Sequence, residues 1–446
     1  MSKTISVIGA GLAGCESAWQ LVENGIKVKL YDMKPANLTP AHISPDYAEL
    51  VCSNSFRSNE LSNAVGLLKE EMRRLGSLII HCADITRIPA GGALAVDRVS
   101  FSRHVTGKIR DHPLIEIFEQ ELTEIPEGIV IIATGPLTSE KLAAKIASYF
   151  PDEKMLKFYD SAAPIVTFES IDMSNAYFAS RYGKGDADYI NCPMDKDLYI
   201  EFYEALITAK SAPVHGFEEK LVFEGCIPLE VMAKRGEDTI RYGPLKPVGL
   251  NDPKTGKEPY AVVQLRKDNA EGTLYNIVGF QTHLSFSEQK RVIGMIPALK
   301  NAEITRYGVM HRNTFLNSPK LLDRFYRLKQ DTHIRFAGQI TGVEGYVESA
   351  ASGLLSGLET ARELLDLPPV CFPKETAIGA LAAYISTGSI SDFQPMNINF
   401  GIITPLDYKV KGKRDKNLAI SKRALKQIDD ISIAISAQKI EGGISR

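Results

Sequence analysis

The sequence predicts an α/β protein with a Rossmann-like domain, a smaller inserted α/β domain and a helical C-terminal region. Three observations predict this class. The chain opens with a strand, a glycine turn, a helix and a second strand, and further apolar strands and amphipathic helices alternate after them. Its 446 residues also exceed the roughly 250–300 at which a single hydrophobic core stops growing. We therefore expect at least two packed units.

The opening unit is a predicted βαβ motif. Thr4–Ile8 is rich in β-branched residues, residues 12–24 repeat apolar side chains with helical spacing, Gly25 ends the helix, and residues 27–31 form the next strand. Parallel strands joined by a helix in this way are typical of Rossmann-like sheets.

The rest of the chain supplies the other elements and the predicted domain boundaries. We expect strands at residues 129–133, 165–168, 262–265, 274–278 and 334–337, and helices at 64–75, 139–149, 321–329 and 350–365. The predicted organisation is a first part of the Rossmann-like domain (1–160), an inserted substrate domain (161–325), a return segment of the Rossmann-like domain (326–370), and a mainly helical region (371–446).

Composition excludes several classes of protein. Hydrophobic residues at 44% and charged residues at 24% are ordinary for a globular chain, and no stretch approaches the ~20 apolar residues of a membrane-spanning helix. No secretory leader is visible, so we expect a cytoplasmic protein with no membrane contact. The six cysteines contain no C-x-x-C pair, which indicates reduced thiols and no metal site.

Charge is unevenly distributed. Between Tyr408 and Lys426, eight basic residues accompany one acid, Asp415, so this window carries +7 although the whole chain carries −2. Such a basic segment on an acidic body indicates either a polyanion partner or a solvated helix face.

A dinucleotide-binding fingerprint occupies the first turn. Gly9, Gly11 and Gly14 form G-x-G-x-x-G between a strand and a helix, and Asp32 ends the second strand. The glycines permit a tight turn, close approach of a pyrophosphate and close helix packing, while the acid binds ribose hydroxyls. The intervening residues predicted to contact the cofactor are Ala10, Leu12 and Ala13.

Two later segments favour FAD over NAD as the tightly bound cofactor. The strand at 129–133 runs into Thr134 and Gly135, which resembles the second nucleotide-contact motif of flavoproteins that bind two dinucleotides. Residues 334–345 form another strand that runs into glycines and resembles the flavin-contacting end of that superfamily. Its predicted contacts are Gly338, Gln339, Gly342 and Val343.

Two cysteines have contexts suited to chemistry. Cys52 lies in a polar loop, and Cys226 lies in a turn shaped by Gly225 and Pro228. A thiol beside charged groups in a fixed turn is a better nucleophile than one in an apolar run. The other four, interpreted as packing residues, are Cys15, Cys82, Cys192 and Cys371.

Ten segments together resemble one known family, the folate- and FAD-dependent tRNA uracil-5-methyltransferases, nearly from end to end. The cysteine-containing segments distinguish this family from the related FAD enzyme that modifies the wobble uridine of tRNA. The sequence departs from the family pattern at Asp32 and Lys34, where we expect Glu and Arg. Asp32 keeps the carboxylate on a side chain that is shorter than that of Glu. The segments are GAGLAG (9–14), VCSNSFRSNE (51–60), PAGGALAVDR (89–98), ATGPLTS (133–139), FEGCIPLEVMAKRG (223–236), RYGPLKPVGL (241–250), GFQTHL (279–284), VMHRNTFLNSP (309–319), FAGQITGVEGYVESAASG (336–353) and MNINFG (396–401).

The resemblance implies an enzyme that methylates C5 of a uridine in the T loop of tRNA. Its carbon donor would be 5,10-methylenetetrahydrofolate, and its reductant would be FAD reduced by NADH or NADPH. The reaction that the resemblance implies needs a nucleophile at C6 and a base, and in this sequence Cys226 is the expected nucleophile and Cys52 the expected base or thiol partner, although the two could exchange roles. His283 and Tyr346 are candidate walls of the folate site, or ordinary polar residues at strand ends.

RNA binding needs phosphate neutralisation and extrusion of the target base. The expected contacts are Lys409, Lys411, Lys413, Arg414 and Lys416, and a second candidate surface comprises Arg306, Arg312, Lys320, Arg324 and Arg327.

Other interpretations remain open on sequence. The same chemistry could act on ribosomal RNA, or the chain could be an FAD oxidoreductase for a small metabolite in which the cysteines are structural. A non-catalytic RNA-binding module or a partner in wobble modification is a third interpretation. The oligomeric state is also open.

Overall fold

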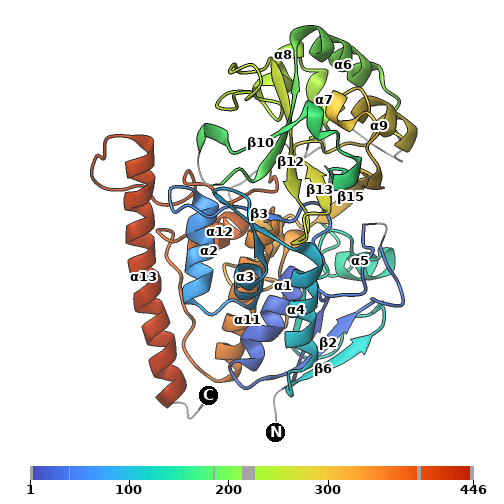
Figure 1. Ribbon diagram of the computed structural model, residues 1–446. Helices are drawn as coiled ribbons and strands as arrows, with labels where there is room; N and C mark the ends of the chain where they lie inside the picture. The colour runs from blue at the N-terminus through green and yellow to red at the C-terminus, as the bar shows by residue number, and fades with distance from the viewer. Residues whose placement is uncertain are drawn as a thin grey trace.

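The computed structural model describes residues 4–39, 41–153, 155–183, 186–212, 227–388 and 393–441. Figure 1 shows a larger body that contains the N-terminal and C-terminal segments and a smaller body at one end of it. Each body has its own hydrophobic core. The predicted α/β class, with an inserted domain and a helical C-terminal region, is confirmed.

A five-stranded parallel sheet forms the centre of the larger body, in the order β16-β7-β1-β2-β6. Every neighbouring pair is parallel, as a Rossmann-like sheet requires. Its edge strand β6 was not predicted, because residues 112–122 mix charged and apolar side chains with little β-branching. The strands are β1 (Thr4–Ile8), β2 (Lys27–Asp32), β6 (Ile115–Glu119), β7 (Val130–Ile132) and β16 (Ile334–Phe336).

Two helices pack closely on this sheet beside the glycine turn. A Cβ added at Gly353 of α11 would lie 2.3 Å from the carbonyl oxygen of Ala13 in α1, so only glycine permits this approach. The Ser17 hydroxyl donates to the Gly353 carbonyl at 3.0 Å. The helices of this body include α1 (Leu12–Val22), α2 (Ala64–Arg74), α3 (Leu78–Ile85), α4 (Arg98–Arg110), α5 (Glu140–Ala147) and α11 (Tyr346–Leu364).

A small antiparallel sheet, in the order β3-β5-β4, lies on the side of the larger body that faces the inserted domain. Its strands are β3 (Ser55–Ser58), β4 (Arg87–Ile88) and β5 (Ala93–Val96). β3 directly follows the polar loop that contains Cys52.

The inserted domain is a six-stranded antiparallel sheet covered by helices. Its strand order is β10-β11-β12-β13-β9-β14. Its strands are β9 (Ile165–Thr167), β10 (Tyr177–Ala179), β11 (Tyr189–Met194), β12 (Ala261–Lys267), β13 (Leu274–Ile277) and β14 (Ile304–Arg306). Its helices include α6 (Lys196–Thr208), α7 (Leu229–Ala233), α8 (Glu237–Tyr242) and α9 (Phe286–Ile293).

Two antiparallel strands, β8 (Leu156–Ser161) and β15 (Met310–Phe315), lead into and out of this domain. Leu316 and Tyr326 already belong to the core of the larger body. The chain therefore returns to the larger body directly after β15, earlier than the predicted boundary at residue 325.

The predicted helix at 321–329 is wrong. α10 covers only Ser318–Leu321, and the chain then turns. The Asp323 carboxylate accepts hydrogen bonds from the backbone N–H groups of Phe325 (2.8 Å) and Arg327 (3.0 Å), and Tyr326 has a positive φ of 63°. An aspartate that binds the backbone two residues ahead favours a turn over a helix.

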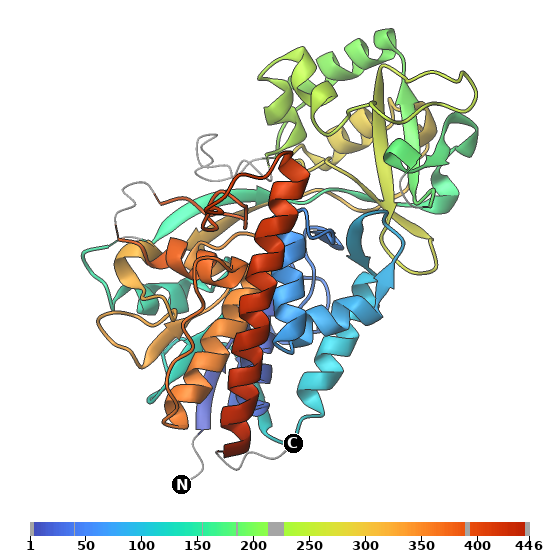
Figure 2. The same ribbon diagram turned by 90° about the vertical axis from the view of Figure 1, so that its left-hand side faces the viewer.

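The C-terminal region is helical as predicted but is not a separate unit. α12 (Ala377–Ser386) and α13 (Lys413–Glu441) add side chains to the core of the larger body. Figures 1 and 2 show α13 as a long helix along the outside of this body, with its first turns at the end nearer the inserted domain.

Candidate functional site

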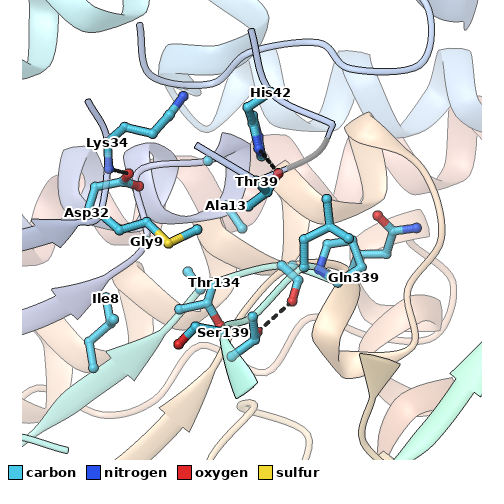
Figure 3. A pocket seen from close by; sticks show the side chains of 18 of the residues that line it. Ile8, Gly9, Ala13, Asp32, Lys34, Thr39, His42, Thr134, Ser139 and Gln339 are labelled. Carbon is cyan, nitrogen blue, oxygen red and sulfur yellow. Dashed lines mark hydrogen bonds between the residues drawn. The ribbon is translucent and has the colours of Figure 1, made fainter. Parts of the chain in front are cut away.

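A cavity opens at the carboxyl ends of the parallel strands. Figure 3 shows Asp32 and Lys34 on one side of it, Gln339 on the other, and Gly9 and Ala13 between them. Ligands of open α/β sheets bind in crevices at this edge. The shape and location therefore suit an extended dinucleotide.

The three fingerprint glycines have different structural roles. Gly9 has φ +98°, and a Cβ there would lie 2.6 Å from the carbonyl oxygen of Ala133. A Cβ on Gly14 would lie 1.7 Å from the carbonyl oxygen of Gly9, so this glycine allows the helix to pack on the turn. Gly11 lines the cavity, and a Cβ there would meet nothing within 4 Å. Only Gly11 keeps space free for a ligand without being needed for packing.

Asp32 lies at the end of β2 and lines the cavity. Its Oδ2 accepts a hydrogen bond from the backbone N–H of Ala10 at 2.5 Å, and its Oδ1 accepts one from the backbone N–H of Lys34 at 2.8 Å. These two bonds hold the carboxylate rigidly and leave further acceptor capacity for hydroxyl groups. The structure thus places Asp32 where a ribose-binding acid is required.

The opposite wall follows β7. Thr134, Gly135 and the turn after them line the cavity, and the Thr134 hydroxyl lies 2.6 Å from that of Thr138. The predicted cofactor contacts end at Gly135, although residues 136–139 continue the same turn and also line the cavity.

The far end of the cavity is formed by the turn before α11. Gly338 has φ +85°, and a Cβ there would lie 2.9 Å from the Cβ of Ala13. Gln339 lines the cavity and donates through Nε2 to the Glu344 carboxylate at 2.6 Å. Burial raises the pKa of the Glu344 carboxyl well above its ordinary value, and the charge of nearby Asp160 adds to this shift. Polar groups thus converge beside the N-terminus of α11.

Most predicted cofactor residues line this cavity, and the others support it. Ala10 holds Asp32, and Gly14 packs on Gly9. A Cβ on Gly342 would lie 2.4 Å from the Phe393 ring, and Val343 is fully buried. The lining residues among those predicted are Gly9, Gly11, Leu12, Ala13, Asp32, Thr134, Gly135, Gly338, Gln339 and Tyr346.

Sequence reasoning missed part of the lining. Gln120, Glu121 and Leu122 follow the unpredicted strand β6, so recognising that strand would have located them. His42 and Glu49 come from the loop after β2, which contains no comparable motif.

Cys52 lies beside the α11 end of the cavity. Tyr346, which lines the cavity, accepts hydrogen bonds at its hydroxyl from the backbone N–H groups of Cys52 (2.8 Å) and Ser53 (3.1 Å). The half-buried Cys52 thiol donates a 3.6 Å hydrogen bond to the Ser161 carbonyl at the end of β8. Burial raises the pKa of Tyr346, so its hydroxyl stays protonated while it orients the cysteine loop.

Cys226 lies outside the described residues, but the residues that flank its segment do not. The Ala212 N–H donates to the His283 carbonyl, and the Leu229 N–H donates to the Gln281 carbonyl, each at 2.7 Å. The ends that flank residues 213–226 are therefore joined to one short stretch of the inserted domain.

His283 is buried in that stretch rather than in the lining of the cavity. Its Nδ1 lies 2.7 Å from Oε1 of Glu230, which also accepts a hydrogen bond from the His283 backbone N–H at 2.9 Å. The two residues predicted as folate walls thus occupy different bodies: Tyr346 is in the dinucleotide cavity, and His283 is in the inserted domain, where its carbonyl accepts a hydrogen bond from the Ala212 N–H.

Three of the four cysteines interpreted as packing residues are buried, and burial raises the pKa of each thiol, to about 12 for Cys82 and Cys192. These thiols are protonated and shielded at neutral pH. Cys371 differs from the prediction because it is exposed.

The predicted RNA contacts lie at and before the start of α13. All five are exposed, and none of them forms an ion pair within the part of the chain that the structure describes. The nearby side chains of Asn417 and Ser421 donate hydrogen bonds to the carbonyls of Ser62 (3.0 Å) and Leu61 (2.7 Å). These hydrogen bonds fix the start of α13 beside the residues that follow β3.

The second candidate RNA surface is already occupied by contacts within the chain. Lys320 pairs with Glu153 at 2.7 Å, and Arg327 pairs with Asp323 at 2.8 Å. Arg306 and Arg324 donate to the carbonyls of Ala41 and Phe372. The side chain of Arg312 lies outside the described residues.

The cavity and the sheet around it define this chain as a dinucleotide-binding α/β protein. Comparison with known proteins narrows that class. Residues 4–368 match the family model described as "Glucose inhibited division protein A". One crystal form of GidA from Aquifex aeolicus aligns with a TM-score of 0.71 at 16% identity, over 97% of this chain and 74% of the GidA chain. A second crystal form aligns with a TM-score of 0.70 at 15% identity, over 98% of this chain and 76% of the GidA chain. These structures share its fold.

Curated relatives are much closer in sequence. A protein of Acetivibrio thermocellus named "Methylenetetrahydrofolate--tRNA-(uracil-5-)-methyltransferase TrmFO" is 61% identical over 95% of this chain and 97% of its own length. A protein of the same name from Listeria innocua is 58% identical over 97% and 99%. The chain belongs to the Glucose inhibited division protein A family and, within it, to the methylenetetrahydrofolate–tRNA-(uracil-5-)-methyltransferases.

Two other kinds of site are absent from the described residues. None of their helices is long and apolar enough to cross a membrane. Nor do these residues include a group of three or more His, Cys, Asp or Glu side chains that could hold a metal ion.

Proposed function

We propose that this chain forms 5-methyluridine in the T loop of tRNA, with FAD, 5,10-methylenetetrahydrofolate as the carbon donor and NADH or NADPH as the source of electrons. Family membership supports the reaction. The observation that carries the proposal is the position of Cys52, which Tyr346 holds beside the dinucleotide cavity. We place the reaction in the cytoplasm, where thiols remain reduced.

The residues present fit FAD. Gly11 leaves open space beside the backbone where a pyrophosphate would approach, and the α1 N-terminus favours its charge. Asp32 would bind the ribose hydroxyls, and the turn at Gly338 and Gln339 would contact the flavin. Reduced FAD would supply the two electrons that convert a transferred methylene into a methyl group.

The thiols would perform the chemistry on the base. C5 of uracil becomes nucleophilic only after a thiolate adds to C6, and a base must later remove the C5 proton. We propose Cys226 for the addition and Cys52 for the proton removal. The location of Cys52 near the α11 end of the cavity supports the second role, because C5 must come close to the carbon donor.

The basic start of α13 would bind phosphates. Five exposed cations there lack ion-pair partners among the described residues, and phosphate neutralisation by Lys and Arg supplies most of the affinity for RNA. The target uridine would have to leave its stack to reach the cavity.

The test is purified protein incubated with unmodified tRNA or ribosomal RNA, 5,10-methylenetetrahydrofolate and NADH or NADPH, followed by mapping of 5-methyluridine. Methylation of the T-loop uridine of tRNA supports the proposal, and methylation of ribosomal RNA alone would move it to that substrate. Flavin turnover with NAD(P)H but no methylation of either RNA would overturn the proposal in favour of a metabolite oxidoreductase.

A further inference from the structure

A buried ion pair crosses the junction between the two bodies, close to Cys52. Arg98, the first residue of α4, donates from Nη2 and Nε to the two carboxylate oxygens of Asp268 at 2.7 and 3.1 Å. Asp268 directly follows β12 of the inserted domain, and the side chains are only 10% and 5% exposed. Forming such a pair is costly because both charges must leave water. Breaking it is also costly, because the loss of one partner leaves an uncompensated buried charge.

The same guanidinium holds the cysteine loop. Arg98 also donates from Nη1 to the carbonyl of Leu50, two residues before Cys52. On the other side of the loop, Tyr346 accepts the N–H groups of Cys52 and Ser53. The backbone of the thiol-bearing residue is thus fixed from α4 and from α11.

The inserted domain completes this arrangement. Arg266 of β12 donates to the Ser53 hydroxyl at 2.8 Å and to the Asn54 side-chain oxygen at 3.1 Å. The Asn54 amide donates in turn to the Lys267 carbonyl at 2.8 Å. Three consecutive residues at the end of β12, Arg266 to Asp268, therefore contact the loop or the arginine that holds it.

The charges near Cys52 have opposite effects on a thiolate. Arg98 lies close enough to Cys52 and Tyr346 for their negative forms to favour its charge, whereas burial opposes it. Burial is the largest single influence and lowers the pKa of the Arg98 guanidinium, but the charge and hydrogen bonds of Asp268, with the negative forms of Tyr346 and Cys52, together hold that pKa above its ordinary value. In general, an arginine near a thiol favours its thiolate by attraction, and a carboxylate paired with that arginine reduces this effect by balancing the positive charge. Arg306 adds a second, half-buried cation near Arg98.

We propose that Arg98 and Asp268 are positioning residues for Cys52, in which the arginine fixes the loop and stabilises the thiolate while the aspartate of the inserted domain limits that stabilisation. The inference deepens the proposed function, on which the role of Cys52 as a reacting thiol rests. It makes the reactivity of Cys52 dependent on how the inserted domain is docked. Removing the charge of Asp268 should then raise the reactivity of Cys52, and removing the charge of Arg98 should lower it. If the two substitutions only loosened the loop, both would change the reactivity in the same direction.

The test measures alkylation of Cys52 by iodoacetamide at pH 7 in the flavin-bound protein, quantified by peptide mass spectrometry. Exposed Cys371 serves as an internal reference in the same molecule. We expect Asp268→Asn to raise the Cys52 rate relative to Cys371 by about tenfold, and Arg98→Met to lower it by about tenfold, because the rate follows the thiolate fraction. Arg98→Lys should restore part of the rate. Asp84→Asn, which removes a carboxylate from the surface pair with Arg73, is the matched control and should change nothing.

Equal rates in Asp268→Asn and wild type, or changes of the same sign in Asp268→Asn and the Arg98 variants, would overturn the proposal. If Arg98→Met does not fold, Arg98→Lys and Asp268→Asn still decide the sign. The alkylation assay needs neither RNA nor folate, so its outcome is independent of methylation. If the variants show the predicted changes in alkylation rate but the wild-type protein methylates no RNA, the proposed function is refuted and this inference is not.

Discussion

Gly14 and Gly11 allow the fold and the cofactor site to be tested separately. An alanine in place of Gly14 would put its Cβ 1.7 Å from the Gly9 carbonyl oxygen, whereas ordinary contact begins at 3.4 Å. The turn and α1 must therefore separate by more than an ångström, and both are backbone. The helix propensity of alanine favours the substitution by about 1 kcal/mol, but overpacking of this kind typically costs about 1–3 kcal/mol and sometimes more. We expect Gly14→Ala to lose about 1–2 kcal/mol of unfolding free energy and to lose bound FAD.

Gly11→Val should behave differently. Its side chain would meet no protein atom near Cβ but would extend into the cavity, so flavin retention should fall while apoprotein stability changes by less than about 0.5 kcal/mol. The assays are urea unfolding of the apoproteins and flavin absorbance after gel filtration. Gly107→Ala, within α4 and with only Asp111 at 4.0 Å from its new Cβ, is the control and should be neutral or stabilising. Stoichiometric flavin in Gly11→Val would show that this turn does not hold the cofactor, and an unchanged midpoint for Gly14→Ala would refute the packing argument.

Three further predictions concern other parts of the chain. Reversing the charges of Lys409 and Lys411 should weaken RNA binding and reduce the slope of log K against log salt by about 0.7–0.9 for each phosphate that is no longer neutralised, with flavin reduction unchanged; an unaltered slope would identify a solvated face. With RNA carrying 5-fluorouridine at the target, Cys226→Ala should abolish covalent trapping and methylation with the flavin spectrum intact, whereas Cys52→Ala should lose methylation but still permit some trapping. The reverse pattern would exchange the two roles, and methylation at the wild-type rate in both variants would remove the thiol mechanism. Burial raises the pKa of Glu71 from 4.5 to about 8, so between these values the folded state keeps a proton that the unfolded state has lost. Stability should therefore fall as pH rises from 5 to 8, by at most about 1.4 kcal/mol per unit, and Glu71→Gln should flatten that part of a urea-unfolding profile; identical slopes would exclude this group as the cause.

Local sequence patterns predicted those elements whose physics is local. Glycine spacing, a β-branched strand and a terminal acid were sufficient for the βαβ unit, because each constraint acts within a few residues of backbone. The basic run before and within α13 was visible for the same reason. The prediction for residues 321–329 failed because an apolar helical period competed with the side-chain-to-backbone bonds of Asp323, which only the folded turn reveals.

The amino-acid sequence by itself determined the fold class, the glycine turn that holds the cofactor and, through resemblance, the family. Only the tertiary structure decided that Tyr346 holds Cys52 across 294 positions of sequence, that His283 packs on Glu230 in the inserted domain, and that Arg98 and Asp268 meet at the junction, 170 positions apart. The physical reason is that hydrogen bonds and ion pairs between such distant residues have no periodicity in the chain, and form only when packing of the two cores brings their strands and helices together.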